Sequence, residues 1–218
     1  MAGTKTKTIG IVQVKGGAGR STVATTLAGE LAKVGKAVLI DCDMPQGTSS
    51  SWASLRQGML GESVIGAYTA AHHRDLVELA DRLAGTVDWI VLDGGPRIAE
   101  TTRAILALSD LVLVPVGASP AELWATTDVI PLIDEARKVR AVDARLVWTR
   151  FRAHTRLAMD LETQAGKELG LRPLKSKLGF RVAYADALGD GSTAAEVGDA
   201  LAREEVEALV SEIQRILK

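Results

Sequence analysis

Short apolar runs alternate along this chain with longer segments in which apolar residues recur every three or four positions. Runs bounded by Gly, Pro or Asp are typical of buried strands, and the longer spacing is typical of helices that cover a sheet. The pattern predicts strands over residues 8–14, 37–40, 63–68, 89–92, 111–116, 144–149 and 171–178. It predicts helices over residues 21–34, 72–83, 98–108, 120–140, 157–169 and 194–217, the last interrupted near Gly198, and a short helix opening at residues 52–56.

Strands that alternate with helices predict βαβ units, and therefore an α/β fold with a mainly parallel sheet flanked by helices on both faces. No linker or repeat divides the chain, so we expect a single domain over residues 1–218, with residues 1–7 as a short flexible segment. Apolar residues make up 47% of the chain and aromatic residues only 4%. A core of Ala, Val, Leu and Ile suits a parallel sheet buried between helices.

Composition excludes several classes of protein. The single cysteine, Cys42, rules out a disulfide within the chain, and one chain cannot supply a cysteine cluster for zinc or iron–sulfur. No segment approaches the roughly 20 apolar residues that a membrane span requires. We therefore expect a cytoplasmic protein.

Charge is unevenly distributed, although the net charge is only −1. Residues 137–181 hold twelve basic and four acidic side chains, so this segment is +8 and the rest of the chain is −9. Such a segment is either a solvated basic face or a surface for a polyanion such as DNA, and the sequence leaves both interpretations open.

The most informative stretch is the glycine-rich turn over residues 14–22, between the first predicted strand and the first predicted helix. Gly16, Gly17 and Gly19 let the backbone approach an anion closely, and backbone N–H groups at a helix N-terminus bind phosphate. Ser21 follows at the position that holds Mg²⁺ in phosphate-binding loops. The alternative is a glycine-rich turn without a ligand, which two later Asp-containing segments make less favourable.

Carboxylates follow the second and fourth predicted strands, at the edge where ligands bind parallel sheets. Asp93 ends the run Trp89–Leu92 and has the setting of a Walker B carboxylate, which would hold Mg²⁺ opposite Ser21. Asp41 and Asp43 follow the second strand in the sequence Asp-Cys-Asp-Met-Pro-Gln-Gly. Without the glycine-rich loop, Asp93 would be an ordinary strand end and Asp41 and Asp43 part of an Asp-rich turn, both without a ligand.

The loop does not fit the ordinary pattern G-x-x-x-x-G-K-[ST]. It resembles the deviant loop K-G-G-x-G-K-[ST] of the ParA/MinD ATPases, with Arg20 in place of the second lysine. The likeness extends from Ile9 to the terminal helix and is greatest to small plasmid-partition ParA proteins of the ParF kind. It implies a P-loop NTPase-like fold that binds ATP or ADP with Mg²⁺. Arginine is larger and forked, so we expect weakened or altered nucleotide binding and impaired hydrolysis.

The resemblance also implies roles for individual residues. Lys15 would reach the phosphates of a partner subunit's nucleotide, Asp43 would orient the attacking water, and Asp41 would support Mg²⁺. Thr149 and Arg150, after the sixth strand, would help recognise adenine. The nucleotide-binding residues are then Lys15, Gly16, Gly17, Ala18, Gly19, Arg20, Ser21, Thr22, Thr149 and Arg150, and the metal-binding residues are Ser21, Asp41 and Asp93.

At the level of function, the resemblance implies a DNA-segregation ATPase. ATP would promote a sandwich homodimer, the dimer would bind DNA without sequence preference on the nucleoid, and a centromere-bound, ParB-like partner protein would stimulate hydrolysis. Three alternatives remain: a MinD-like membrane-surface protein, a positioning ATPase for a protein cargo, and a nucleotide switch that no longer hydrolyses ATP. The terminal helix has an acidic polar face, which disfavours anionic membranes, so we expect no stable membrane association.

Overall fold

The strands form one parallel sheet in the computed structural model, which describes residues 5–61, 65–96, 99–152 and 156–218. Within these residues the sheet has seven strands in the order β3-β2-β4-β1-β5-β6-β7, and every neighbouring pair is parallel. The strands are β1 (Lys7–Ile11), β2 (Ala37–Asp41), β3 (Gly66–Thr69), β4 (Trp89–Asp93), β5 (Leu111–Gly117), β6 (Ala144–Phe151) and β7 (Arg172–Gly179). The predicted α/β fold class is confirmed.

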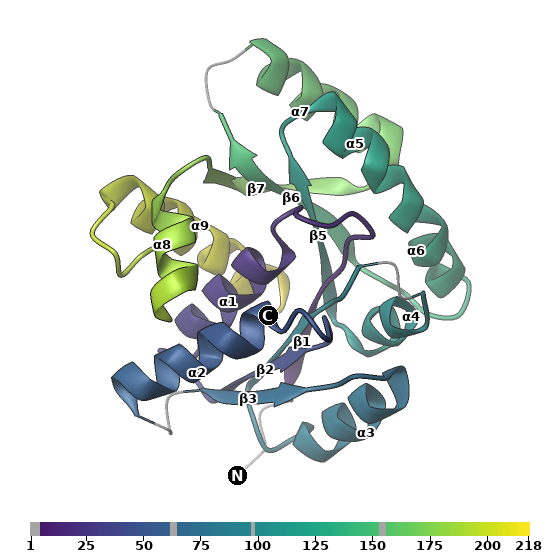
Figure 1. Cartoon of the computed structure of the whole chain (residues 1–218). Helices are drawn as coiled ribbons and strands as arrows, with labels where there is room; N and C mark the ends of the chain where they lie inside the picture. The colour runs from purple at the N-terminus through teal and green to yellow at the C-terminus, as the bar shows by residue number, and fades with distance from the viewer. Residues whose placement is uncertain (1–4, 62–64, 97–98, 153–155) are drawn as a thin grey trace.

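Helices cover both faces of this sheet (Figure 1). One face carries α1 (Arg20–Leu31), α2 (Thr48–Leu60), α8 (Ala183–Asp190) and α9 (Ala200–Ile216). The other carries α3 (His73–Leu83), α4 (Ala99–Leu108), α5 (Pro120–Thr126), a 3-10 turn (Thr127–Val129), α6 (Ile130–Arg137) and α7 (Arg156–Leu169). Because every crossover runs through a helix, the carboxyl ends of all strands open on the same edge of the sheet.

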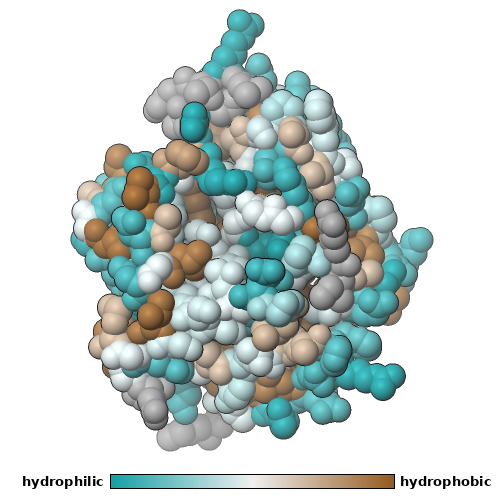
Figure 2. All heavy atoms as spheres, viewed as in Figure 1, coloured by the Kyte–Doolittle hydropathy of each residue, from teal (hydrophilic) through white to brown (hydrophobic). Residues whose placement is uncertain are grey.

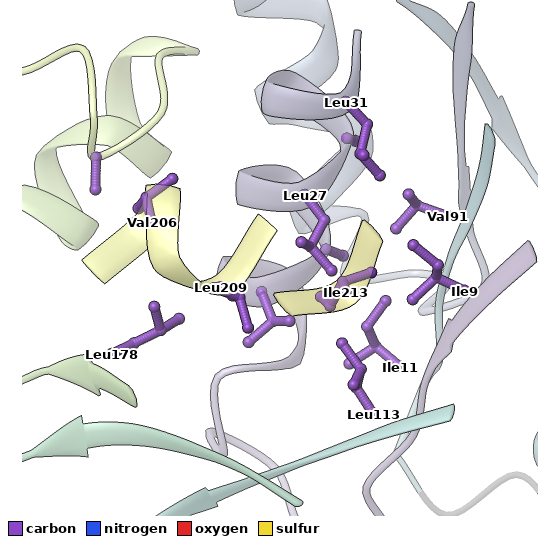
Figure 3. Packing of buried hydrophobic residues seen from close by; sticks show 14 of the residues in the cluster. Ile9, Ile11, Leu27, Leu31, Val91, Leu113, Leu178, Val206, Leu209 and Ile213 are labelled. Atoms are coloured by element: carbon purple, nitrogen blue, oxygen red, sulfur yellow. The ribbon is translucent and has the colours of Figure 1, made fainter. Parts of the chain in front are cut away.

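The core consists mainly of aliphatic side chains, as the scarcity of aromatic residues predicts. Leu27 and Leu31 of α1 lie against Ile9 of β1 and Val91 of β4, and Leu209 and Ile213 of α9 close the same cluster (Figure 3). All of these side chains are fully buried. Helix α1 is therefore fixed against the middle of the sheet, which fixes the loop that precedes it.

Several helix boundaries differ from those predicted. The expected helix over residues 120–140 is broken into α5, a 3-10 turn and α6, because Pro131 lacks an N–H and its ring clashes with the preceding turn. Helix α9 begins at Ala200 rather than at residue 194, since Gly198 has a φ of 87° and Asp199 caps the helix through the N–H groups of residues 201 and 202. Helix α2 begins at Thr48, four residues before the predicted opening.

Helix α8 was not predicted as a helix; it is only eight residues long, too short to show a clear helical period. At the other end of the chain, the first four residues of the segment expected to be flexible lie outside the described residues. Thr6 donates a hydrogen bond to the carbonyl of Val87, and Lys7 already belongs to β1. The strand thus begins inside that segment.

Gly10 lies where α4 packs directly on the backbone of β1. A Cβ at this position would overlap the side chains of Ile105 and Ser109. We predict that Gly10→Ala lowers the free energy of unfolding by about 1–3 kcal/mol, since overpacking displaces helix and strand. Urea unfolding measures the change.

Gly58, inside α2, provides a matched control. A Cβ there meets nothing within 4 Å, so Gly58→Ala should be neutral or stabilising by about 0.5–1 kcal/mol through helix propensity. Equal effects of the two substitutions would contradict the close approach of α4 to β1.

Candidate phosphate-binding site

The glycine-rich loop leaves the central strand β1 and enters α1 through two left-handed glycines. Gly17 has a φ of 75° and Gly19 a φ of 95°, conformations that other residues rarely adopt. A Cβ at Gly16 or Gly17 would meet nothing within 4 Å, so one side of the loop is open. The first N–H groups of α1 have no acceptor within the helix and are directed to this side. The loop therefore has the backbone geometry of an anion cradle.

Arg20 turns back across the base of the loop. Its Nη1 donates hydrogen bonds to the carbonyl oxygens of Gln13 and Lys15, both at 2.7 Å. Its Nη2 lies 3.4 Å from Asp43 Oδ2, at the long end of ion-pair distances. The side chain is only 6% exposed. The guanidinium thus closes the loop from within and places a permanent cation between the loop and the segment after β2.

Asp93, at the end of β4, is fully buried beside the first turn of α1. The pKa of its carboxyl is raised to about 7, chiefly by burial and also by the charge of Asp41, although the hydroxyls of Ser21 and Ser49 and the charge of Arg20 act to lower it. Although these hydroxyls lie near, no hydrogen bond of normal geometry reaches either carboxylate oxygen. This carboxylate is electrostatically unsatisfied and directed toward Ser21.

Buried polar atoms without a hydrogen-bond partner gather at this site. Among the described residues there are six such side-chain atoms, and four of them belong to Arg20, Ser49 and Asp93. Buried polar atoms are nearly always bonded in native proteins, so such a group calls for an ion, water or ligand. Carboxylate and hydroxyl oxygens are the ligands that Mg²⁺ prefers. The residues present therefore fit a magnesium–phosphate ligand.

A metal held by the protein alone does not fit. No group of three or more His, Cys, Asp or Glu side chains in the described part of the chain could hold a metal ion. One carboxylate and one hydroxyl are the usual protein contribution to a magnesium ion that also takes water and substrate phosphate oxygens. Metal binding here is thus expected to depend on the phosphate ligand.

Asp41 and Asp43 lie beside this centre but are used differently. Asp41 accepts hydrogen bonds from the N–H of Asp43 at 2.9 Å and from the N–H and hydroxyl of Ser50 at 2.9 and 2.7 Å. Both of its oxygens hold the segment that leads into α2, and neither is free to face a metal directly. Asp43 lies against Arg20. Gly95 lets the segment after β4 approach Asp43 closely, since a Cβ at Gly95 would lie 3.3 Å from Asp43 Cα.

A mainly apolar cavity of about 410 Å³ adjoins the loop. Gly19, Thr22 and Thr149 line one side, and the segment from Leu178 to Leu188 lines the other. Thr149 Oγ1 donates a hydrogen bond to the carbonyl of Ala18 at 2.9 Å, which ties the end of β6 to the loop. The cavity has the size and character of a pocket for one planar ring system with its sugar.

Sequence comparisons agree with this geometry. A family model described as an AAA domain matches residues 6–68, which include the loop and the segment after β2. The chain is 30% identical to the chromosome-partitioning ATPase Soj of Thermus thermophilus, over 90% of each chain. The chain belongs to the ParA/MinD family of ATPases.

Two further comparisons cover nearly the whole chain of this ATPase. It is 27% identical to maintenance of carboxysome distribution protein A of Halothiobacillus neapolitanus, over 98% of this chain and 99% of that protein. The fold matches that of a McdA–ATP complex from Cyanothece with a TM-score of 0.81 and 16% identity, covering 97% of this chain and 98% of that one. Family membership and fold therefore rest on independent observations.

Sequence reasoning placed the loop, Asp43, Asp93, Thr149 and Arg150 at one site, and the structure of this ATPase brings them together. It did not find Glu122 of α5, which lies 2.8 Å from Lys15 Nζ, nor Ser49 beside Asp93. Their only sequence signal is the position of each in the first turn of a helix that follows a strand end.

The buried carboxylate predicts a specific pH dependence. The pKa of Asp93 is raised in the folded chain to about 7, whereas an unfolded Asp titrates near 4. Above pH 4 the unfolded chain binds fewer protons, so this group destabilises the ligand-free fold increasingly up to about pH 7. We predict that Asp93→Asn stabilises the fold at pH 8 by on the order of 2 kcal/mol, and much less at pH 4.5.

Urea unfolding of both forms at the two pH values, without Mg²⁺ or nucleotide, measures this difference. A stability difference that is the same at pH 4.5 and pH 8 would show that Asp93 is not a strained buried carboxylate.

Proposed function

We propose that this chain is a Mg²⁺-dependent ATPase whose ATP-bound form dimerises and positions a cargo on DNA. The unsatisfied Asp93 carboxylate, directed at Ser21 beside an open glycine loop, is the observation that carries the proposal. A buried acid in such a place is explained by a magnesium–triphosphate ligand and has no structural role of its own.

Each role that a magnesium–ATP site requires has a candidate residue in this chain. The N–H groups over Gly16–Thr22 would hold the phosphates, and Ser21 and Asp93 would hold Mg²⁺, which supplies charge neutralisation when bound. Asp41 would support this arrangement by fixing Asp43 through its backbone, and Asp43 would orient the attacking water. Thr149 and Arg150, which line the adjoining cavity, would face the base.

Arg20 is expected to weaken the chemistry without abolishing nucleotide binding. Two of its N–H contacts are already made to the carbonyls of Gln13 and Lys15, and its Nε has no partner. A lysine ammonium could keep those two contacts and direct a third N–H toward the phosphates from a smaller volume. A nucleotide switch that binds ATP but hydrolyses it very slowly is therefore the alternative that this residue favours.

Arg20→Lys tests this interpretation. We predict that the variant raises ATP turnover by at least about tenfold, because one well-placed cationic donor contributes this much or more to transition-state stabilisation. Phosphate release at saturating Mg-ATP measures the rate, and Arg20→Met serves as the control that lacks the cation. Equal turnover of Arg20→Lys and the parent chain would show that arginine does not limit hydrolysis.

A DNA surface is supported by the basic segment, although ion pairs reduce its charge. Arg137, Arg145, Arg150, Lys177 and Arg181 each pair with a carboxylate. Exposed cations remain along the edge strand β7 and on α7, among them Arg172, Lys175 and Lys167. Phosphate neutralisation by such residues is sufficient for binding without sequence preference.

The cargo has two candidates that the relatives suggest. Soj is a chromosome-partitioning ATPase, and a relative that matches over 98% of this chain is named for the maintenance of carboxysome distribution. A replicon with a ParB-like partner protein is the first candidate and a protein assembly is the second. Both would use the same nucleotide-driven homodimer, and association with the nucleoid would follow from DNA binding.

A membrane-surface role is disfavoured by the packing of α9. Val206, Leu209 and Ile213 of its apolar stripe are fully buried, and Glu212 accepts hydrogen bonds from the backbone N–H groups of Lys175 and Ser176. Among the described helices none combines the length and apolar character needed to cross a bilayer. The prediction that α9 packs on the domain is confirmed.

Lys175→Glu tests the DNA surface. In the presence of Mg-ATP we expect the variant to bind a random DNA duplex several-fold more weakly. The slope of the logarithm of the binding constant against the logarithm of the salt concentration should become shallower by about one, because one phosphate contact is lost. Fluorescence anisotropy across a salt series measures both. Lys36→Glu makes the same charge change at the opposite edge of the sheet, before β2, and should bind like the parent chain. If both variants weaken DNA binding equally, the net charge of the chain and not a surface at β7 would account for the binding.

A further inference from the structure

Lys15 is held within its own chain by one carboxylate. Its Nζ lies 2.8 Å from Glu122 Oε1, and the same oxygen lies 3.3 Å from Arg150 Nη2. The three residues come from the loop after β1, the first turn of α5 and the end of β6, so the cluster joins three neighbouring strand ends. Glu122 is 16% exposed, whereas Lys15 is 35% and Arg150 44% exposed. The acid is thus the most buried member of the cluster, and the two cations are more exposed to solvent.

Glu122 owes its position to a second contact between α5 and the loop. Gln13 Nε2 donates to Thr126 Oγ1 at 2.9 Å, and Gln13 Oε1 accepts from the N–H of Val14 at 2.9 Å. Thr126 Oγ1 in turn donates to the carbonyl of Glu122 at 2.8 Å. Because Gln13 is buried and bonded at both ends, the loop and α5 keep one relative position, with Glu122 beside Lys15.

Arg150 reaches Glu122 from a strained backbone. It is the single non-glycine residue in the described part of the chain with a positive φ, at 49°. Residues other than glycine persist in such conformations chiefly where the surroundings or the function require it. Gly117 provides the space, since a Cβ there would lie 3.0 Å from Arg150 Nη2 and 3.1 Å from Glu122 Cγ. The positive φ of Arg150 and the absence of a side chain at Gly117 thus both permit the contact between Arg150 and Glu122.

We propose that Glu122 is a positioning residue that retains Lys15 in the monomer and releases it to the partner subunit's nucleotide. The inference rests on the proposed function, in which Lys15 acts across a nucleotide-bound dimer. Arg150 makes the exchange favourable, because it continues to neutralise Glu122 after Lys15 has left. Without this second cation, release would leave a poorly solvated carboxylate unpaired.

Two readouts test this role on the full-length chain. In Glu122→Gln, Lys15 loses its charged partner, so its amine should react faster with an acylating reagent, measured by mass spectrometry against Lys36 in the same chain. The Mg-ATP concentration for half-maximal dimer, measured by light scattering after size exclusion, should fall about two- to five-fold, the effect of removing one partly exposed ion pair.

Glu135→Gln is the matched control. Glu135 of α6 pairs with Arg103 at 2.9 Å, away from the loop, and its loss should change neither Lys15 reactivity nor dimerisation. The melting temperature of each variant shows whether the fold is intact. A general loss of structure would lower this temperature and would not promote the dimer.

The outcomes separate the two claims. Suppose that the parent chain dimerises with Mg-ATP and that Glu122→Gln needs the same or a higher Mg-ATP concentration for half-maximal dimer. Glu122 then does not restrain Lys15, and the inference is overturned. Unchanged acylation of Lys15 in the variant overturns it independently of nucleotide. If neither form binds Mg-ATP or dimerises, the proposed function itself fails, and the inference fails with it.

Discussion

The contact between the Arg20 guanidinium and the carbonyl oxygens of Gln13 and Lys15 determines how the site is built. It closes the glycine loop from within, holds a cation under the open side of the loop, and extends to Asp43 in the segment after β2. Because arginine remains charged at every accessible pH, this arrangement favours an anion in the loop at all times. The same contact uses two of its donors on the protein, so we expect the site to bind phosphate but to hydrolyse ATP slowly.

The sheet supplies the other half of the constraint. Strands β1, β2 and β4 are adjacent and parallel, with Ile11 in register with Asp93 and Asp41 in register with Asp93 on its other side. Three segments that are far apart in the sequence are thereby placed side by side at one edge of the sheet. The apolar cavity adjoins the loop at this edge. Hydrophobic residues also gather on the surface over α8 and α9 (Figure 2). Val182 and Leu201 are among the exposed hydrophobic residues of that part of the chain. Charge lies at the strand ends and apolar surface lies beside it.

Much of this arrangement could be predicted from the sequence, because its elements are set by local patterns. Apolar runs ending in Asp41 and Asp93 predicted strand ends, and the glycines between Lys15 and Ser21 predicted the turn. Contacts that depend on the tertiary structure could not be predicted. These are the hydrogen bond between Asp41 and Ser50, the return of the Arg20 side chain onto its own loop, and the position of Glu122 of α5 beside Lys15. Helix boundaries failed where one residue overrides periodicity, as Pro131 and Gly198 do. The role of each site residue stays a prediction.

The account depends on a polyphosphate binding in the glycine loop with Arg20 beneath it and Asp93 at its magnesium ion. Calorimetric titration of the full-length chain with ATP, in the presence and absence of Mg²⁺, tests this most directly. We predict saturable binding of one ATP per chain that is much weaker without Mg²⁺ and is not reproduced by adenosine. Absence of saturable binding, or equal affinity for ATP and adenosine, would contradict the account.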